Sequence, residues 1–113
     1  MENSELIIND EIVGNGRETI RGALLIVNYI GKLEDGTQFD SSFDRGKPFQ
    51  FVFGTGRVIK GWDQGLIGMK VGGTRNLFVP FHLGYGERQV GTLIKPFSNL
   101  LFKVELIEVL TRD

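Results

Sequence analysis

Four polar side chains of this 113-residue sequence stand among apolar neighbours, and their types point to a binding cleft. They are two phenols, a carboxylate and a guanidinium: Tyr29, Asp40, Arg45 and Tyr85. Polar groups are costly to bury in an apolar core unless they are hydrogen-bonded. We therefore expect these side chains to line a cleft or to pair with one another, while most of the phenylalanines form the core.

The sequence offers no apparatus for hydrolysis, phosphoryl transfer or metal catalysis. It has no cysteine and one histidine, His82, which we interpret as a surface or turn residue, so no metal cluster can be assembled. The glycine turns at 54–56 and 84–86 lack the third glycine of a dinucleotide loop, and residues 56–61 lead into Trp62 rather than into Lys-Ser/Thr. No serine lies in a nucleophile elbow. We expect neither a metal nor a cofactor.

Period-two alternation predicts the strands that must position these residues. The segment 24–31 is largely apolar on both faces and is predicted to be a central strand. Residues 48–53 place three phenylalanines on one side, and residues 100–106 alternate between apolar and polar, as half-buried antiparallel strands do. After the first strand, Asp35-Gly36 predicts a type I′ hairpin turn, which requires positive φ at both central residues.

One segment has helical spacing instead. Its apolar residues are Val58, Ile59, Trp62, Leu66 and Met69, and Gly68 and Gly72-Gly73 end it. A single short helix among strands would place Trp62 against the concave side of the sheet. The predicted fold class is α+β, a bent antiparallel sheet of five to six strands wrapped around one short α-helix.

The bulk composition is that of one globular domain spanning residues 1–113, with residues 1–5 as a loose tail. Hydrophobic residues make up 41% and charged residues 24%. The net charge of -1 indicates no nucleic-acid binding. The apolar runs are too short to cross a membrane. The polar, acidic start differs from a targeting segment. Together with the lack of cysteine, this leads us to expect a cytoplasmic monomer.

Six short segments form a recognisable series along the chain. They are VNYIGKLEDGTQFDSS at 27–42, PFQF at 48–51, VIKGWD at 58–63, MKVG at 69–72, LGYG at 83–86 and LLFKVEL at 100–106. Together they resemble the FKBP-type (tacrolimus-binding) peptidyl-prolyl cis-trans isomerases, in order and with intact spacing over about residues 6–110. The resemblance implies an enzyme that accelerates X-Pro bond rotation during protein folding.

The resemblance also implies a shallow aromatic pocket floored by Trp62, in which the Ile59 N–H and the Tyr85 hydroxyl bind carbonyl oxygens of the substrate. The residues it marks as catalytic are Tyr29, Phe39, Asp40, Ile59, Trp62, Tyr85 and Phe102. Those it marks as binding substrate or inhibitor are Arg45, Phe49, Val58, Val90, Leu93 and Ile94. The implied partners are proline-containing polypeptides and the macrolides tacrolimus and rapamycin.

The loop 87–96 departs from the family pattern. Val90 stands where many members have histidine, Thr92 replaces a glycine, and Lys95 replaces the first proline of a Pro-Pro pair. We expect these changes to loosen the rim and alter ligand preference while leaving the floor intact.

Two alternatives to the enzyme stay open at this point. One is a non-catalytic module that binds proline peptides, and the other is a chaperone-like holder of unfolded chains. The retention of the pocket residues favours the enzyme. A ligand that blocks the pocket discriminates the holder from the enzyme, according to whether the ligand abolishes the effect on unfolded chains.

Overall fold

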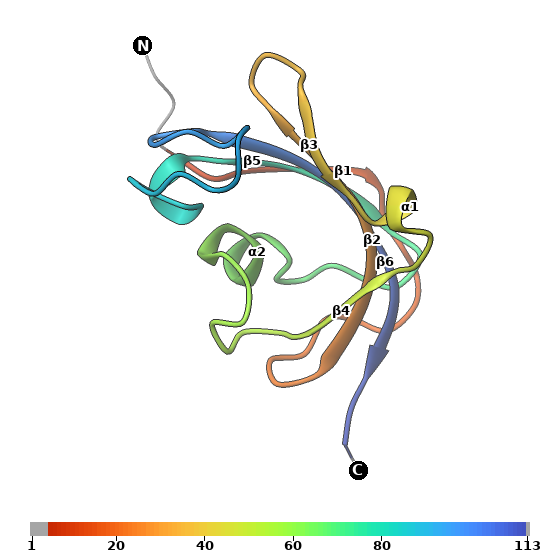
Figure 1. Ribbon diagram of the computed structural model, residues 1–113. Coiled ribbons are helices and arrows are strands. Elements are labelled where there is room, and N and C mark those ends of the chain that lie inside the picture. Colours follow the sequence, from red (N-terminus) through yellow and green to blue (C-terminus); the bar gives the residue numbers. More distant parts are fainter. Residues whose placement is uncertain (1–4, 113) are drawn as a thin grey trace.

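A strongly curved antiparallel sheet organises the chain (Figure 1). The computed structural model describes residues 5–112. The strands are β1 (Ile7–Ile12), β2 (Leu24–Leu33), β3 (Gln38–Ser41), β4 (Phe49–Val52), β5 (Thr74–Val79) and β6 (Leu100–Leu110). The helices are α1 (Ser42–Arg45), α2 (Lys60–Gly65) and the 3₁₀ helix η1 (Phe81–Leu83). The strand order is β1-β5-β6-β2-β3, and β4 pairs with β2.

This architecture confirms the predicted fold class, with α2 held on the concave side of the sheet (Figure 1). Of the tail expected at residues 1–5, only Glu5 lies within the described residues, and it is exposed. Among residues 5–112, no helix is long and apolar enough to span a bilayer.

The predicted central strand is confirmed, because β2 pairs with β3, β4 and β6. Its concave face buries Leu25, Val27 and Tyr29. Opposite it, β6 carries a bulge: Ile26 pairs with Glu108 but Val27 pairs with Leu106. An extra residue of this kind bends a strand and increases its twist. The bulge therefore helps the sheet to curve.

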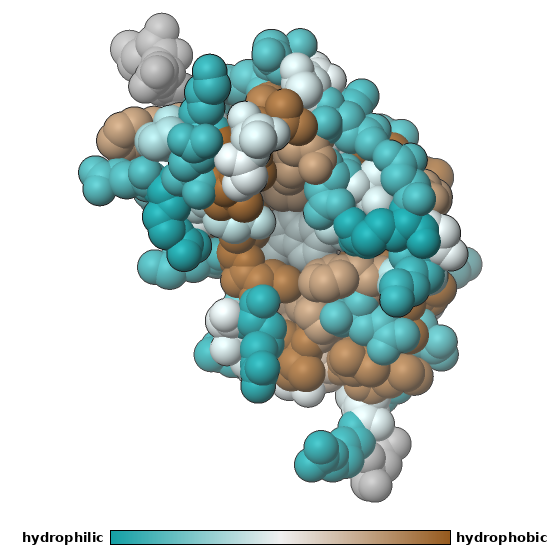
Figure 2. Space-filling model, in the orientation of Figure 1, coloured by the Kyte–Doolittle hydropathy of each residue, from teal (hydrophilic) through white to brown (hydrophobic). Residues whose placement is uncertain are grey.

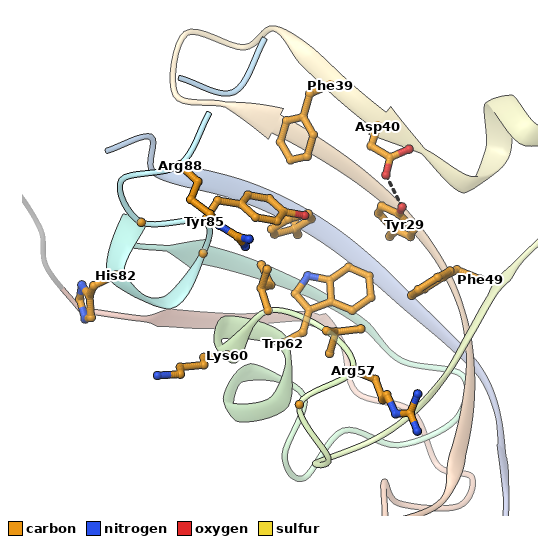
Figure 3. Close-up of a pocket in the computed structure, with 16 residues that line it drawn as sticks. Tyr29, Phe39, Asp40, Phe49, Arg57, Lys60, Trp62, His82, Tyr85 and Arg88 are labelled. Carbon is orange, nitrogen blue, oxygen red and sulfur yellow. Dashed lines mark hydrogen bonds between the residues drawn. The ribbon is translucent and has the colours of Figure 1, made fainter. Parts of the chain in front are cut away.

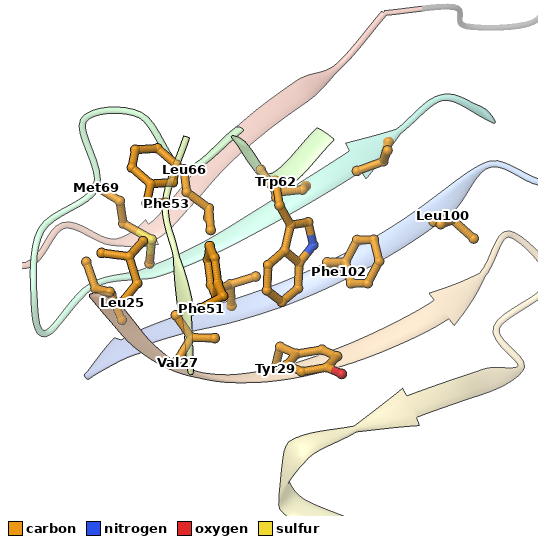
Figure 4. Packing of buried hydrophobic residues seen from close by; sticks show 14 of the residues in the cluster. Leu25, Val27, Tyr29, Phe51, Phe53, Trp62, Leu66, Met69, Leu100 and Phe102 are labelled. Atoms are coloured by element: carbon orange, nitrogen blue, oxygen red, sulfur yellow. The ribbon is translucent and has the colours of Figure 1, made fainter. Parts of the chain in front are cut away.

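Helix α2 packs on β5 through two glycines. A Cβ atom on Gly61 would lie 2.4 Å from Val79 Cγ1, and one on Gly65 would lie 2.9 Å from Leu77 Cδ2. The backbone of the helix thus rests directly on the strand. Its other face presents Trp62 to the core, where the indole lies between aromatic side chains of the sheet (Figure 4).

The helix is shorter than the spacing predicts. Ile59 has extended backbone at its start, and Gly68 has a φ of +79° just beyond its end. Its last turn is capped by Arg75 of β5, whose Nη1 donates to the carbonyl oxygens of Gly65 at 2.9 Å and Ile67 at 2.8 Å. Arg75 also forms an ion pair with Asp10 of β1. One buried guanidinium therefore joins β1, β5 and α2, a connection that the sequence pattern does not reveal.

The predicted type I′ turn between β2 and β3 is wrong. Gly36 has a φ of +92°, but Asp35 is not among the residues with positive φ. Gly36 N–H donates to Leu33 C=O, and the Asp35 carboxylate accepts the Thr37 N–H at 2.9 Å. This side-chain hydrogen bond stabilises an Asx turn, in which Asp35 keeps an ordinary negative φ.

Candidate active site

An open cavity of about 670 Å³ lies over Trp62. Every residue predicted to be catalytic lines it, and so do Phe49 and Val58. Figure 2 shows the molecule hollowed near the middle of this face, with pale and brown groups in the hollow and hydrophilic groups around it. Figure 3 shows that the lining side chains come from the sheet, from α2 and from the segment after η1.

Trp62 forms the floor and is 4% exposed. Its indole makes edge contacts with the rings of Tyr29 at 5.0 Å, Phe102 at 5.4 Å and Phe49 at 6.1 Å between centroids. Its Nε1 is buried and is the one such side-chain polar atom without a hydrogen-bond partner among the described residues. The floor is therefore aromatic, with one buried donor that has no partner among the described residues.

Phe39 enters the cavity because of a bulge and a glycine. On β3, Gln38 pairs with Lys32 and Asp40 pairs with Gly31, so Phe39 has no opposite residue on β2. A Cβ on Gly31 would lie 2.7 Å from the Phe39 ring. The absence of a side chain at Gly31 thus lets Phe39 reach across β2 to Phe102, with 5.7 Å between ring centroids.

Tyr29, Asp40 and Arg45 form one network beside the floor. Tyr29 donates its hydroxyl hydrogen to Asp40, and Arg45 forms an ion pair with the same carboxylate. Arg45 Nη2 also donates to Tyr29 Oη at 3.0 Å. Burial, together with the hydrogen bond to Asp40, raises the pKa of Tyr29 to about 12. Tyr29 is thus a neutral phenol at physiological pH.

A single helical turn sets this network in place. The Ser41 hydroxyl accepts from the N–H groups of Phe43 and Asp44 and caps α1, and Gly46 ends the helix with a φ of +74°. Within α1, the buried Ser42 hydroxyl accepts the Tyr29 N–H at 2.8 Å. Helix α1 therefore fixes both the strand that carries Tyr29 and the position of Arg45.

The Val58–Ile59 wall is positioned from α2. The Asp63 carboxylate accepts the N–H groups of Gly54 at 2.8 Å and Gly56 at 3.0 Å, which holds the preceding loop against the helix. Ile59 C=O accepts the Trp62 N–H at 3.0 Å. The Ile59 N–H makes no hydrogen bond to a described residue, so this donor is available at the cavity wall.

Tyr85 follows η1 on the other side of the cavity. The turn is closed by the Gly86 N–H, which donates to Phe81 C=O at 2.9 Å. Burial, and then the negative charge of Asp40, raise the pKa of Tyr85 above its ordinary value. Its hydroxyl has no hydrogen-bond partner within residues 5–112, so it is a neutral group able to donate to a ligand.

Four predicted site residues do not line the cavity. Arg45 lies behind Asp40 and acts through the network. The backbones of Val90 and Ile94 pair with each other, which turns Ile94 into the core at 5% exposure and leaves Val90 and Leu93 at the surface. Contact between this loop and a larger ligand stays a prediction.

Sequence reasoning also missed part of the lining. Arg57, Lys60, His82 and Arg88 border the cavity, as do the glycines of the turns at 56, 84 and 86. His82 is exposed on η1, as expected of a turn residue. Arg57 and Lys60 are the sequence neighbours of the predicted pocket residues Val58 and Ile59, and this adjacency could have predicted that both cations border the cavity. No group of three side chains able to hold a metal ion occurs in the described part of the chain.

Comparison with known proteins gives consistent similarities. Residues 16–107 match the family model described as FKBP-type peptidyl-prolyl cis-trans isomerase. A protein of Neisseria meningitidis serogroup A named FK506-binding protein is 50% identical over 104 residues, covering 92% of this chain and 95% of that protein. The crystal structure of AtFKBP13 matches with a TM-score of 0.87 and 46% identity over 91% of each chain. That of FkpA from Escherichia coli matches with a TM-score of 0.85 and 40% identity, over 93% of this chain and 48% of the other.

Proposed function

This chain belongs to the FKBP-type peptidyl-prolyl cis-trans isomerases and is an isomerase, and we propose that the cavity over Trp62 is its catalytic site. The observation that carries this proposal is an aromatic cavity over Trp62 with two available donors, Ile59 N–H and Tyr85 Oη. No nucleophile is needed for this reaction.

The reaction is a rotation about a partial double bond. Resonance in the X-Pro amide imposes a barrier of about 18–20 kcal/mol, and uncatalysed interconversion takes tens to hundreds of seconds. In the twisted transition state the resonance is lost and the amide is less dipolar. An apolar cavity disfavours the planar ground state more than the twisted state, and such differential binding lowers the barrier.

The available donors hold the bound chain in the twisted orientation. Ile59 N–H and Tyr85 Oη, on separate walls, donate to carbonyl oxygens of the substrate while the prolyl ring lies over Trp62. Asp40 is a positioning residue in this scheme, because its carboxylate bonds Tyr29 and Arg45 rather than Tyr85. The network holds the Tyr29 hydroxyl, and the Tyr29 ring contacts the indole of the floor.

A protease-free isomerisation assay tests the proposed site. We expect purified protein to accelerate the relaxation of a Leu-Pro tetrapeptide, with a preference for apolar residues before proline because Phe39 and Phe49 line the cavity. A relaxation rate that stays at the uncatalysed value would overturn the proposal.

Tacrolimus and rapamycin are the proposed inhibitors of this site. The name of the neisserial relative supports macrolide binding. Trp62 is the single tryptophan of the chain, so its emission reports on the floor alone. We expect saturating macrolide to change this emission and to raise the melting temperature, as a ligand that binds the native state does. No change in either signal would count against macrolide binding at the floor.

The wider setting is also part of the proposal. We infer a single-domain monomer that acts on proline-containing polypeptides in the cytoplasm, supported by the one continuous sheet and the absence of cysteine. Light scattering of the purified protein and fractionation of the source cells test these two statements.

A further inference from the structure

Three cations border the active-site cavity without an acidic partner. Arg57, Lys60 and Arg88 line it and are exposed. Among residues 5–112, the ion pairs involve Arg45, Arg75 and Lys103 as cations and none of these three. Their charges are therefore directed to solvent and to whatever enters the cavity.

The acidic groups nearby are already engaged or lie outside the cavity. Asp40 is the one carboxylate in the lining, and it is neutralised by Arg45 and hydrogen-bonded by Tyr29. Asp63 holds the N–H groups of the loop before Val58. Glu87 is exposed and does not line the cavity. The whole chain has a net charge of only -1, so the positive mouth is a local feature and not a consequence of composition.

The cations lie at two ends of the site. Figure 3 shows Arg57 on the same side of Trp62 as Phe49, whereas Lys60 and Arg88 lie on the opposite side. A bound chain that places its prolyl ring on Trp62 must extend past the floor in both directions. If the chain runs from the Arg57 end to the end with Lys60 and Arg88, its flanking residues meet a cation on either side.

We propose that the preferred substrates of this isomerase are proline segments with an apolar residue before proline and acidic residues flanking that pair on both sides. This inference rests on the proposed function. Positive charge around an apolar cleft attracts negatively charged chains and speeds their productive encounter. Arg57, Lys60 and Arg88 thus determine specificity, while the aromatic floor performs the rotation.

The test is a peptide series with a constant Leu-Pro-Phe core and Glu, Gln or Lys placed before it, after it or on both sides. The readout is kcat/KM from NMR exchange spectroscopy at 20 mM and 300 mM salt. Exposed ion pairs contribute little each, so we expect Glu peptides to exceed Gln peptides by about two- to five-fold per acid at low salt. Lys peptides should fall below Gln peptides, and high salt should shrink both differences.

Variants show which residues cause the effect. In each variant, the kcat/KM of a Glu peptide is divided by that of the matching Gln peptide, and this Glu-to-Gln ratio is compared with that of the wild type. Arg57→Gln should lower the ratio for acids at one end of the peptide, and Arg88→Gln or Lys60→Gln should lower it for acids at the other end. Lys32→Gln is the matched control, because it also removes one positive charge but its side chain lies outside this cavity. It should leave both ratios as in the wild type.

The outcomes separate this inference from the proposed function. If no peptide is turned over, the proposed function fails. If neutral peptides are turned over but the Glu-to-Gln ratio is one at low salt, only the acidic preference is overturned. A raised ratio that survives in Arg57→Gln, Lys60→Gln and Arg88→Gln would show that other groups cause it, and would also overturn the assignment.

Discussion

At the residue scale, the two tyrosines of the cavity differ in what their hydroxyl groups contact. Tyr29 donates to Asp40 and accepts from Arg45, so its hydroxyl is fully engaged. The Tyr85 hydroxyl has no partner in the described part of the chain. In the proposed mechanism, the same side-chain type therefore has a positioning role on β2 and a substrate-binding role after η1.

Replacing Tyr85 by phenylalanine separates these roles. We expect Tyr85→Phe to lower kcat/KM on a Leu-Pro peptide by about two- to ten-fold, the equivalent of one lost hydrogen bond. The free energy of unfolding should change by less than about 1 kcal/mol, since no bond within the protein is broken. Isomerase assays and urea titrations on both proteins measure the two effects. Wild-type turnover in a folded Tyr85→Phe would exclude this hydroxyl from catalysis.

The raised pKa of Tyr29 predicts a loss of stability in alkali. Its ordinary pKa of 10.0 rises to about 12 in the folded protein. The unfolded chain therefore releases this proton near pH 10 and the folded chain does not, so stability is intact below pH 10 and falls as the pH rises through 12. The loss attributable to Tyr29 is about 2 kcal/mol. Urea midpoints between pH 9 and 12 should fall less steeply in Tyr29→Phe; equal slopes in the two proteins would contradict the assignment.

At the scale of elements, β2, β4 and β6 were predictable, whereas β1, β5 and the short turns were not. Strand β2 follows from a segment that is apolar on both faces, and β4 and β6 follow from the alternation of apolar and polar residues. Trp62 follows from helical spacing. Helix α1 is a single turn, too short to show a period, and it depends on the Ser41 cap and on Gly46. The floor of the site was thus predictable, because it is built on regular elements.

The rim was predicted less well because its geometry depends on backbone pairing. The hydrogen bonds between Val90 and Ile94 close a turn around Gly91, whose φ is +61°. This pairing decides that Ile94 is buried and that Leu93 is exposed. Side-chain types alone carry no information about such a turn. The predicted type of the turn after β2 was wrong for a similar reason, since the Asp35 carboxylate accepts a hydrogen bond from the nearby Thr37 N–H.

The close packing of α2 on β5 gives a prediction with an internal control. Gly61→Ala places a methyl group against Val79 and should cost about 1–3 kcal/mol of stability by overpacking. It should also shift Trp62 and reduce isomerase activity. The double variant Gly61→Ala/Val79→Ala removes the obstructing methyl groups. Its loss of unfolding free energy should therefore be smaller than the sum of the losses in the two single variants. If the losses measured by urea unfolding are strictly additive, the contact between Gly61 and Val79 does not limit how closely α2 packs on β5.

Lys95 gives the second prediction at this scale. Its N–H makes no hydrogen bond to a described residue and its side chain is exposed, so proline can replace it without the loss of a bond. Lys95→Pro should strengthen macrolide binding by about 0.4–1 kcal/mol through reduced loop entropy, with tetrapeptide turnover nearly unchanged. Paired titrations and isomerase assays decide this. Equal macrolide affinity in the two proteins would show that the loop does not limit binding.

At the scale of the whole molecule, Arg75 of β5 connects β1 and the end of α2. It is 6% exposed, pairs with Asp10 and caps α2. Arg75→Met should cost about 1–3 kcal/mol, because it leaves the buried carbonyl oxygen of Gly65 and that of Ile67 without their donor. Lys103→Gln is the control: it breaks the exposed Lys103–Glu11 pair and should change stability by less than about 1 kcal/mol. Similar losses in the two variants, measured by urea unfolding, would rule out a special role for Arg75.

The place of β6 in the strand order has a consequence for protein synthesis. β6 pairs with β5 on one side and with β2 on the other, so it alone joins β1 and β5 to the rest of the sheet. Among the strands of this sheet it is also the last to be synthesised, and it carries Phe102 of the cavity wall. A nascent chain that has not reached Leu100 therefore holds two unjoined sets of strands and no complete pocket. If the cavity is the catalytic site, as proposed, we expect isomerase activity only after translation has passed β6, so the chain cannot assist its own folding before that point.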